Sequence, residues 1–210
     1  MMLSFRNLLA DHSPLLLLDA ASARIQVGFF GAGALRGSWE ASDEEAGVGI
    51  FRCVENLAVD LDAVRAFAFC EGPGSVLGIR TAAMALRTWG VLDPRPVFAY
   101  GSLAVVAQAQ GQPDAAVIAD ARRGSWHRCA LRGPLSRVPT AELAGKLMMP
   151  EGFRNWTPLP AGVERVPYAL ADLLPRVADA GLFRSVEAPD AFLHEEPQYA
   201  SWTPQVHRAP

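Results

Sequence analysis

The chain has 210 residues, of which 50% are hydrophobic and 20% are charged, and its formal net charge is −3. This composition excludes a disordered chain and supplies enough apolar surface for one domain or two small ones, while the near-neutral charge argues against strong autonomous nucleic-acid binding. The longest apolar stretch, around Leu15–Leu18, is too short to cross a membrane, and three widely spaced cysteines without a secretory signal favour the reducing cytoplasm.

The first predicted elements form a β-hairpin over residues 15–40. Asp19 ends its first strand, and Ser22 lies in the tight turn that follows. The acidic residues of 42–45 then open a helix that runs to about Ala58, because negative charge suits a helix N-terminus.

The next predicted unit is a strand, a glycine-rich turn and a helix. The apolar run 66–70 predicts a buried strand, and residues 76–89 follow with helical spacing and with Gly90 as a stop signal. The turn between them, 72–75, ends in Ser75, which suits a helix N-cap. Such a turn either holds an anion or packs a helix closely on a sheet.

Three features of this turn weigh against a nucleotide loop. Pro73 removes one backbone donor, and no lysine follows as a phosphate-binding P-loop requires. A dinucleotide fold needs an acidic residue after the next strand, 97–100, whereas Asp93 lies before it. A packing loop is therefore favoured, with a dinucleotide loop as the minor alternative.

A second hairpin repeats the plan of the first. After a helix over 102–110, capped by Ser102, the strand 115–120 ends in Asp120, and the strand 125–132 returns after a small-residue turn. Two related halves made of a hairpin and helices are predicted.

These halves correspond to an N-terminal domain, 1–105, and a C-terminal domain, 106–210. In the second, residues 140–148 predict a helix, and Pro167 and Pro175 each mark a position where a helix could begin. The last fourteen residues lack periodicity and suggest an extended strap or a frayed end.

The sequence contains few candidates for catalytic or metal-binding residues. No two histidines share helical i,i+3 or i,i+4 spacing, which argues against a metal centre. Cys70, at a strand end before a helix, is either an activated nucleophile or, as its apolar neighbours favour, a buried core residue. A basic strip could contact phosphate or could simply be solvated; it comprises Arg122, Arg123, Arg128 and Arg132.

The helix 76–89 is apolar on most of its sides. Such a helix is either central to a core or shared with a partner. The second interpretation makes Met84, Arg87 and Trp89 candidate interface residues.

Four segments together resemble a known family. They are LDAASARIQVGFF, CEGPGSVLGIR, ADARRGSWHRCAL and a late P-x-Y at Pro197–Tyr199. In this order they are similar to the motifs of the TsaB (YeaZ) family, the inactive relatives of the glycoprotease-like TsaD proteins. The resemblance implies an α/β, two-lobed actin/hexokinase/Hsp70-like fold with the ribonuclease H-like motif and a shortened C-terminal lobe.

The resemblance also implies a function. Family members act as non-catalytic scaffolds in forming the threonylcarbamoyl group on adenosine 37 of tRNA; they pair with the catalytic subunit TsaD and support recruitment of the ATPase TsaE. The partner surface would comprise the helices 43–58 and 76–89. No metal, no cofactor and no catalysis of its own are expected, with ATP or ADP at the interface of the complex as an alternative, and contact with tRNA would be indirect or weak.

Two other interpretations stay open. The first is a nucleotide-binding enzyme of the actin-like ATPase class, in which phosphates in the cleft between the lobes would be contacted by Asp19, Ser22, Gly74, Ser75 and Asp120. The second is a homodimer formed through the same pair of helices.

Overall fold

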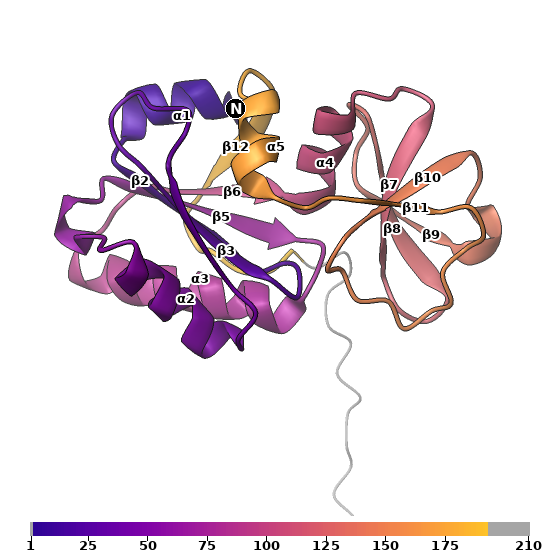
Figure 1. The fold of residues 1–210 in the computed structure, drawn as a ribbon, viewed down its shortest axis with the longest axis horizontal. Coiled ribbons are helices and arrows are strands. Elements are labelled where there is room, and N and C mark those ends of the chain that lie inside the picture. Colours follow the sequence, from indigo (N-terminus) through magenta and orange to yellow (C-terminus); the bar gives the residue numbers. More distant parts are fainter. Residues whose placement is uncertain (1, 193–210) are drawn as a thin grey trace, which may run out of the picture.

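The computed structural model describes residues 2–192, which fold around two β-sheets with helices packed on them (Figure 1). The larger sheet has the strand order β1-β12-β6-β5-β2-β3-β4, and the smaller has the order β11-β10-β7-β8-β9. The strands of the larger sheet are β1 (Met2–Ser4), β2 (Leu15–Asp19), β3 (Ile25–Phe30), β4 (Ser38–Ser42), β5 (Ala66–Gly72), β6 (Val97–Gly101) and β12 (Gly181–Val186). Those of the smaller sheet are β7 (Ala115–Asp120), β8 (Ser125–Ala130), β9 (Ser136–Pro139), β10 (Lys146–Pro150) and β11 (Glu164–Val166). The predicted α/β class is confirmed.

The α-helices of this part of the chain cover both faces of the larger sheet. They are α1 (Phe5–His12), α2 (Ala46–Asn56), α3 (Val76–Leu92), α4 (Ser102–Gln110) and α5 (Leu170–Arg176). In Figure 1, α2 and α3 lie below the sheet and α1 and α5 above it, while α4 lies between the two sheets. Because β2 is covered on both faces, all four leucines of Leu15–Leu18 are fully buried.

The two sheets repeat one topology. Each contains an antiparallel meander, β2-β3-β4 in the larger and β7-β8-β9 in the smaller. The next strand in each, β5 or β10, then pairs in parallel with the first strand of its meander, and one more parallel strand follows it. The predicted likeness of the two hairpins thus extends to five strands of each sheet.

The crossovers differ between the halves. In the larger sheet the connections into β5 and β6 contain α2 and α3. In the smaller sheet the first of these connections contains only a 3-10 turn at Thr140–Glu142, and the second is the loop 151–163. The second half therefore carries loops where the first carries helices.

The helix predicted over 140–148 is wrong. Residues Lys146–Pro150 form strand β10, which lies between β7 and β11, and Leu147, Met148 and Met149 are all buried. A short continuous apolar run has the same appearance in a buried parallel strand and in a buried helix, and only the partner strands decide between them.

Three smaller predictions also need correction. Helix α3 continues through Gly90, the predicted stop, to Leu92. Ser102 is the first residue of α4 rather than its N-cap, and its hydroxyl donates to the Pro73 carbonyl at 2.6 Å. Pro175 lies inside the last turn of α5 instead of opening a helix.

The C-terminal part of the chain returns to the larger sheet. Residues 115–166 supply the strands of the smaller sheet, but β12 pairs antiparallel with β6 and with β1. The larger sheet thus takes strands from both predicted domains, 1–105 and 106–210. The predicted C-terminal strap and the Pro197–Tyr199 motif lie outside the described residues.

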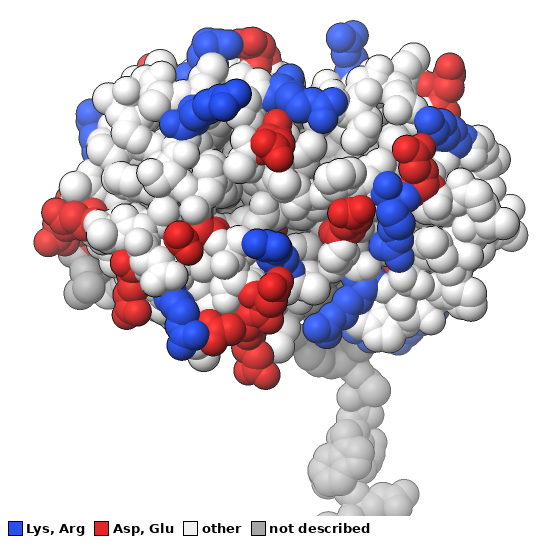
Figure 2. All heavy atoms as spheres, viewed as in Figure 1, with Lys and Arg blue, Asp and Glu red and all other residues white. Residues whose placement is uncertain are grey.

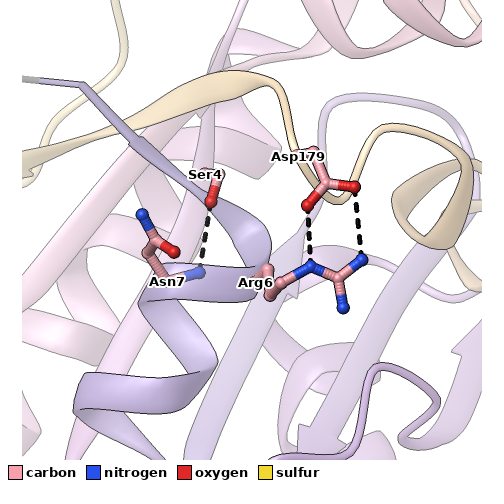
Figure 3. Close-up of polar contacts among 4 residues, drawn as sticks. All are labelled: Ser4, Arg6, Asn7 and Asp179. Atoms are coloured by element: carbon pink, nitrogen blue, oxygen red, sulfur yellow. Dashed lines mark hydrogen bonds and ion pairs between the residues drawn. The ribbon is translucent and has the colours of Figure 1, made fainter.

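An ion pair at the N-terminus supports this return. Ser4 caps α1 by accepting the Asn7 amide, and the Arg6 guanidinium forms two hydrogen bonds, of 2.7 and 3.2 Å, with the Asp179 carboxylate just before β12 (Figure 3). The Arg6 amide also donates to the Ala178 carbonyl at 2.9 Å.

None of the helices in residues 2–192 combines the length and apolar character that a membrane span requires.

Candidate functional site

The glycine loop between β5 and α3 packs against the turn that follows β2. The Ser75 amide donates to the Ala21 carbonyl at 2.7 Å, and the Ser75 side chain caps α3 by accepting the Gly78 amide at 3.3 Å. A Cβ atom on Gly74 would lie 2.3 Å from the Ala21 carbonyl oxygen, so only glycine fits there. The predicted packing loop and the predicted N-cap are both present.

This packing uses groups that a phosphate would need. Gly78 packs equally closely against the preceding residue of the same turn. A Cβ atom on Gly78 would lie 2.3 Å from the Ala20 carbonyl oxygen. A carbonyl oxygen at this position repels an anion, and the Ser75 amide already has a partner. The geometry at Gly74 and Ser75 therefore favours helix packing over phosphate binding.

Asp19 is a fully buried carboxyl at the end of β2. Its Oδ2 accepts hydrogen bonds from the hydroxyls of Tyr100 and Tyr168, both at 2.7 Å, and its Oδ1 accepts the Ala21 amide at 3.0 Å. Burial penalises the carboxylate more than these donors stabilise it, so the pKa of Asp19 is raised. The side chain joins three segments of the chain and has no exposed surface with which to meet a phosphate.

Cys70 belongs to the same buried group. It is almost fully buried, and burial followed by the charge of Asp19 raises the pKa of its thiol well above the ordinary value. A thiol that is hard to ionise is a poor nucleophile. The structure thus agrees with a core cysteine, the favoured of the two sequence interpretations.

Ser22 lines a cavity of about 650 Å³ beside the edge of the larger sheet. Its hydroxyl donates to the Arg24 carbonyl at 2.6 Å and so stabilises its own turn. The charged side chains that line the cavity are Arg24, Glu40 and Glu151. The volume suits a small molecule, but of the five predicted phosphate contacts only Ser22 is part of the lining.

Asp120 has a structural role at the end of β7. Its carboxylate accepts three backbone amides: Arg122 at 2.5 Å, and Trp156 and Thr157 each at 2.6 Å. Burial alone would raise the pKa of Asp120, but the amides of Thr157, Arg122 and Trp156 hold it below the ordinary value. Asp120 therefore ties the loop 151–163 to the turn of the second hairpin.

The basic strip predicted on the second hairpin is only partly assembled. Arg122 and Arg123 lie exposed in the turn, whereas β8 ends at Ala130 and leaves Arg132 in a separate turn. The described residues also contain no cluster of three or more histidine, cysteine or acidic side chains that could hold a metal ion.

The outer faces of α2 and α3 form an exposed apolar surface, here called the α2–α3 face. On α3, Leu77, Met84 and Val91 are exposed by 78%, 55% and 82%. On α2, Val48 and Phe51 are also exposed. A groove of about 400 Å³ lies at one end of this face; its lining includes Phe51, Val54, Val59, Leu61 and Trp89.

The three predicted interface residues have different environments. Met84 is exposed, as an interface residue should be. Arg87 lies 3.7 Å from the Asp190 carboxylate, so part of its charge is already paired. Trp89 packs with its ring 5.7 Å from Phe67 and 6.1 Å from Phe51, and it serves mainly to join α3 to β5 and α2.

No protein-family model and no curated protein matches the chain. Among solved structures, it is similar to YeaZ from Pseudomonas aeruginosa, with 23% identity, a TM-score of 0.55, and 80% of this chain and 90% of that chain covered. The chain has a YeaZ-like fold. A second structure, of an uncharacterized protein from Pseudomonas aeruginosa with similarity to peptidase YeaZ, gives 23% identity, a TM-score of 0.54, and coverage of 78% and 89%.

The YeaZ-like fold confirms the sequence resemblance at the level of architecture. Sequence reasoning did not select Leu77 and Val91 as candidate interface residues, although the spacing of Leu77, Met84 and Val91 by seven residues places them on one face of α3. It also missed Tyr100 and Tyr168, which lie 81 and 149 residues from Asp19 along the chain. No local pattern could have predicted those two contacts.

Proposed function

We propose that this chain is a non-catalytic partner subunit in forming the threonylcarbamoyl group on adenosine 37 of tRNA. In this role it would pair with a TsaD-type catalytic subunit and support recruitment of a TsaE-type ATPase in the cytoplasm. The YeaZ-like fold and the family motifs of the sequence support the proposal. The repeated strand order of the two sheets is what a two-lobed, actin-like fold with a shortened second lobe would have.

The observation that carries the proposal is the α2–α3 face. Leu77, Met84 and Val91 recur every seven residues and form one stripe along α3, and Phe51 on α2 lies beside this helix. Large apolar side chains left exposed along one face of a helix favour an interaction site, because leaving them in water is unfavourable. A helical partner packed along this stripe would bury it.

A matched pair of variants tests this role. Met84→Glu places a charge in the centre of the stripe, and Met2→Glu places the same charge on a methionine of similar exposure, 52% against 55%, in β1 at the far edge of the larger sheet. Met84→Glu should weaken capture of the cognate TsaD-type subunit at least tenfold, because it buries an unpaired charge. Met2→Glu should change it less than twofold.

Titration by biolayer interferometry measures both affinities. The proposal would be contradicted if the well-folded wild-type chain did not bind the TsaD-type subunit at micromolar concentration. Sedimentation of the isolated chain tests the homodimer interpretation on the same face: self-association that Met84→Glu leaves intact would exclude the stripe as the dimer interface.

The cavity beside Ser22 favours one second candidate, a nucleotide-binding enzyme. Its volume of about 650 Å³ is in the range of small-molecule sites. Calorimetry with ATP and Mg²⁺ separates the two functions, since a nucleotide enzyme releases or absorbs heat on binding in the absence of any partner protein. The absence of heat together with an unchanged melting temperature would remove this candidate.

A further inference from the structure

Positive charge is concentrated in the smaller sheet. Residues 115–166 carry eight basic and four acidic side chains, whereas the whole chain carries 19 basic and 22 acidic ones. The remainder of the chain therefore carries more acidic than basic side chains, and Figure 2 shows acidic side chains along the lower edge of the larger-sheet half on the face in view. An anionic partner approaching the chain is drawn to the smaller sheet and repelled by the larger one.

An arginine and a tryptophan form a stacked pair on this part of the molecule. The Arg122 guanidinium lies 3.8 Å from the centre of the Trp156 ring, yet the tryptophan remains 58% exposed. The guanidinium covers one face of the indole, and more than half of the surface of the residue is nevertheless exposed. A large aromatic surface is thus presented to solvent beside a positive charge.

The backbone holds this pair in place before any ligand arrives. The Asp120 carboxylate accepts the amides of both Arg122 and Trp156, so one side chain positions both partners. Arg122 and its neighbour Arg123 have φ angles of 62° and 53°, a left-handed conformation that is uncommon for residues other than glycine. The loop that carries Trp156 is additionally held by Arg165, which donates to the Asn155 side chain at 3.2 Å.

Further arginines flank the pair. Arg123 adjoins Arg122 in the hairpin turn, and Arg154 precedes Trp156 by two residues; both are exposed. Neither forms an ion pair with a carboxylate of residues 2–192, although arginines elsewhere on the surface do. Their charges are therefore available to an external anion. We call Arg122, Arg123, Arg154 and Trp156 the tryptophan platform.

We infer that the tryptophan platform binds single-stranded nucleic acid, with a base stacked on the free face of Trp156 and phosphates paired with the arginines. A basic surface around an exposed aromatic ring is the arrangement used for single strands, because every base can stack and every nucleotide carries a phosphate. A duplex cannot use the indole, because its bases are already stacked on one another. An acidic peptide would use the arginines and leave the ring exposed. The inference goes beyond the α2–α3 face and does not depend on it.

Binding of a fluorescent, unstructured twelve-nucleotide RNA to the full chain tests this inference. Trp156→Ala should weaken binding at least tenfold, and Trp156→Phe should stay within about threefold of wild type, because phenylalanine still offers a stacking surface. The double variant Arg123→Gln/Arg154→Gln should also weaken binding at least tenfold at low salt. It should flatten the dependence of affinity on salt, by about 0.7 in logarithmic slope for each phosphate that the arginines no longer neutralise.

Controls separate this surface from general electrostatics and from the partner face. The double variant Arg36→Gln/Arg65→Gln removes the same charge from exposed positions of the larger-sheet half, and it should bind RNA as the wild type does. Met84→Glu should bind RNA as the wild type does. The tests of the α2–α3 face and of the tryptophan platform can therefore fail independently of each other. Equal binding of duplex RNA, binding unaffected by Trp156→Ala in a folded variant, or a phosphopeptide that competes with the same tryptophan dependence would overturn the inference.

Discussion

At the scale of single residues, Asp19 shows how the same side chain can be a ligand site in one environment and a core group in another. A carboxylate at the end of a first strand, followed by a small-residue turn, is a reasonable candidate for binding a phosphate-bound metal. Here two tyrosine hydroxyls occupy one of its oxygens, and the Ala21 amide occupies the other. The residue then contributes to stability by an amount that depends on pH.

The raised pKa of Asp19 predicts how its contribution to stability changes with pH. Because its folded pKa lies above its unfolded value, the protonated group adds stability that is fully present below about pH 4, the unfolded value, and is lost as the pH rises through the folded pKa. Asp19→Asn cannot ionise. In urea denaturation from pH 4 to pH 8, the free energy of unfolding of the variant should therefore rise relative to that of the wild type as the pH rises. The expected change is about 1.4 kcal/mol for each unit by which the folded pKa exceeds the unfolded one.

An exposed aspartate gives the matched control for this experiment. Asp11→Asn removes the same charge at an exposed position near the end of α1, and the difference between it and the wild type should not follow the trend of Asp19→Asn. A difference between Asp19→Asn and the wild type that stays constant from pH 4 to pH 8 would show that Asp19 has an ordinary pKa in the folded protein.

At the scale of elements, the unit formed by β5, the glycine loop and α3 was predictable because all of its signals are local. An apolar run, a glycine turn and a serine cap follow one another within a short stretch of chain, and the structure contains each of them. Strand β10 was not predictable in the same way, because its strand character comes from β7 and β11, which are distant from it along the chain. The position of the loop 151–163, which carries Trp156, and the contacts of Asp19 depend on distant partners in the same way.

Two glycines of this unit should respond in opposite directions to the same substitution. Gly74→Ala would place a Cβ atom 2.3 Å from a backbone oxygen that cannot move freely, and it should lower the free energy of unfolding by about 1–3 kcal/mol. Gly90→Ala lies inside α3 with nothing within 4 Å of the new atom, and it should raise that free energy by about 1 kcal/mol. Urea denaturation measures both. A Gly74→Ala variant as stable as wild type would contradict the close packing of this loop on the Ala21 turn.

At the scale of the whole molecule, the segment after β11 connects the two sheets. Tyr168 reaches Asp19 at the end of β2, and the Gln26 side chain on β3 accepts the Leu170 amide at 2.9 Å and donates to the Tyr168 carbonyl at 3.0 Å. The Ala23 amide also donates to the Gly152 carbonyl at 2.8 Å. These bonds tie the smaller sheet to the larger one beside the cavity that Ser22 lines.

Gln26→Leu should loosen this connection without melting the larger sheet. Leucine has a similar size but leaves the Tyr168 carbonyl and the Leu170 amide without their partners, at a cost of about 1–3 kcal/mol for each buried group. Local opening of the segment should therefore speed hydrogen exchange at the Leu170 amide far more than at Leu17, in the centre of β2. Gln112→Leu, a half-buried glutamine before β7, supplies the control and should leave both amides unchanged. Equal acceleration at Leu170 and Leu17 would mean that the two sheets open as one cooperative unit and that Gln26 is not a local clamp.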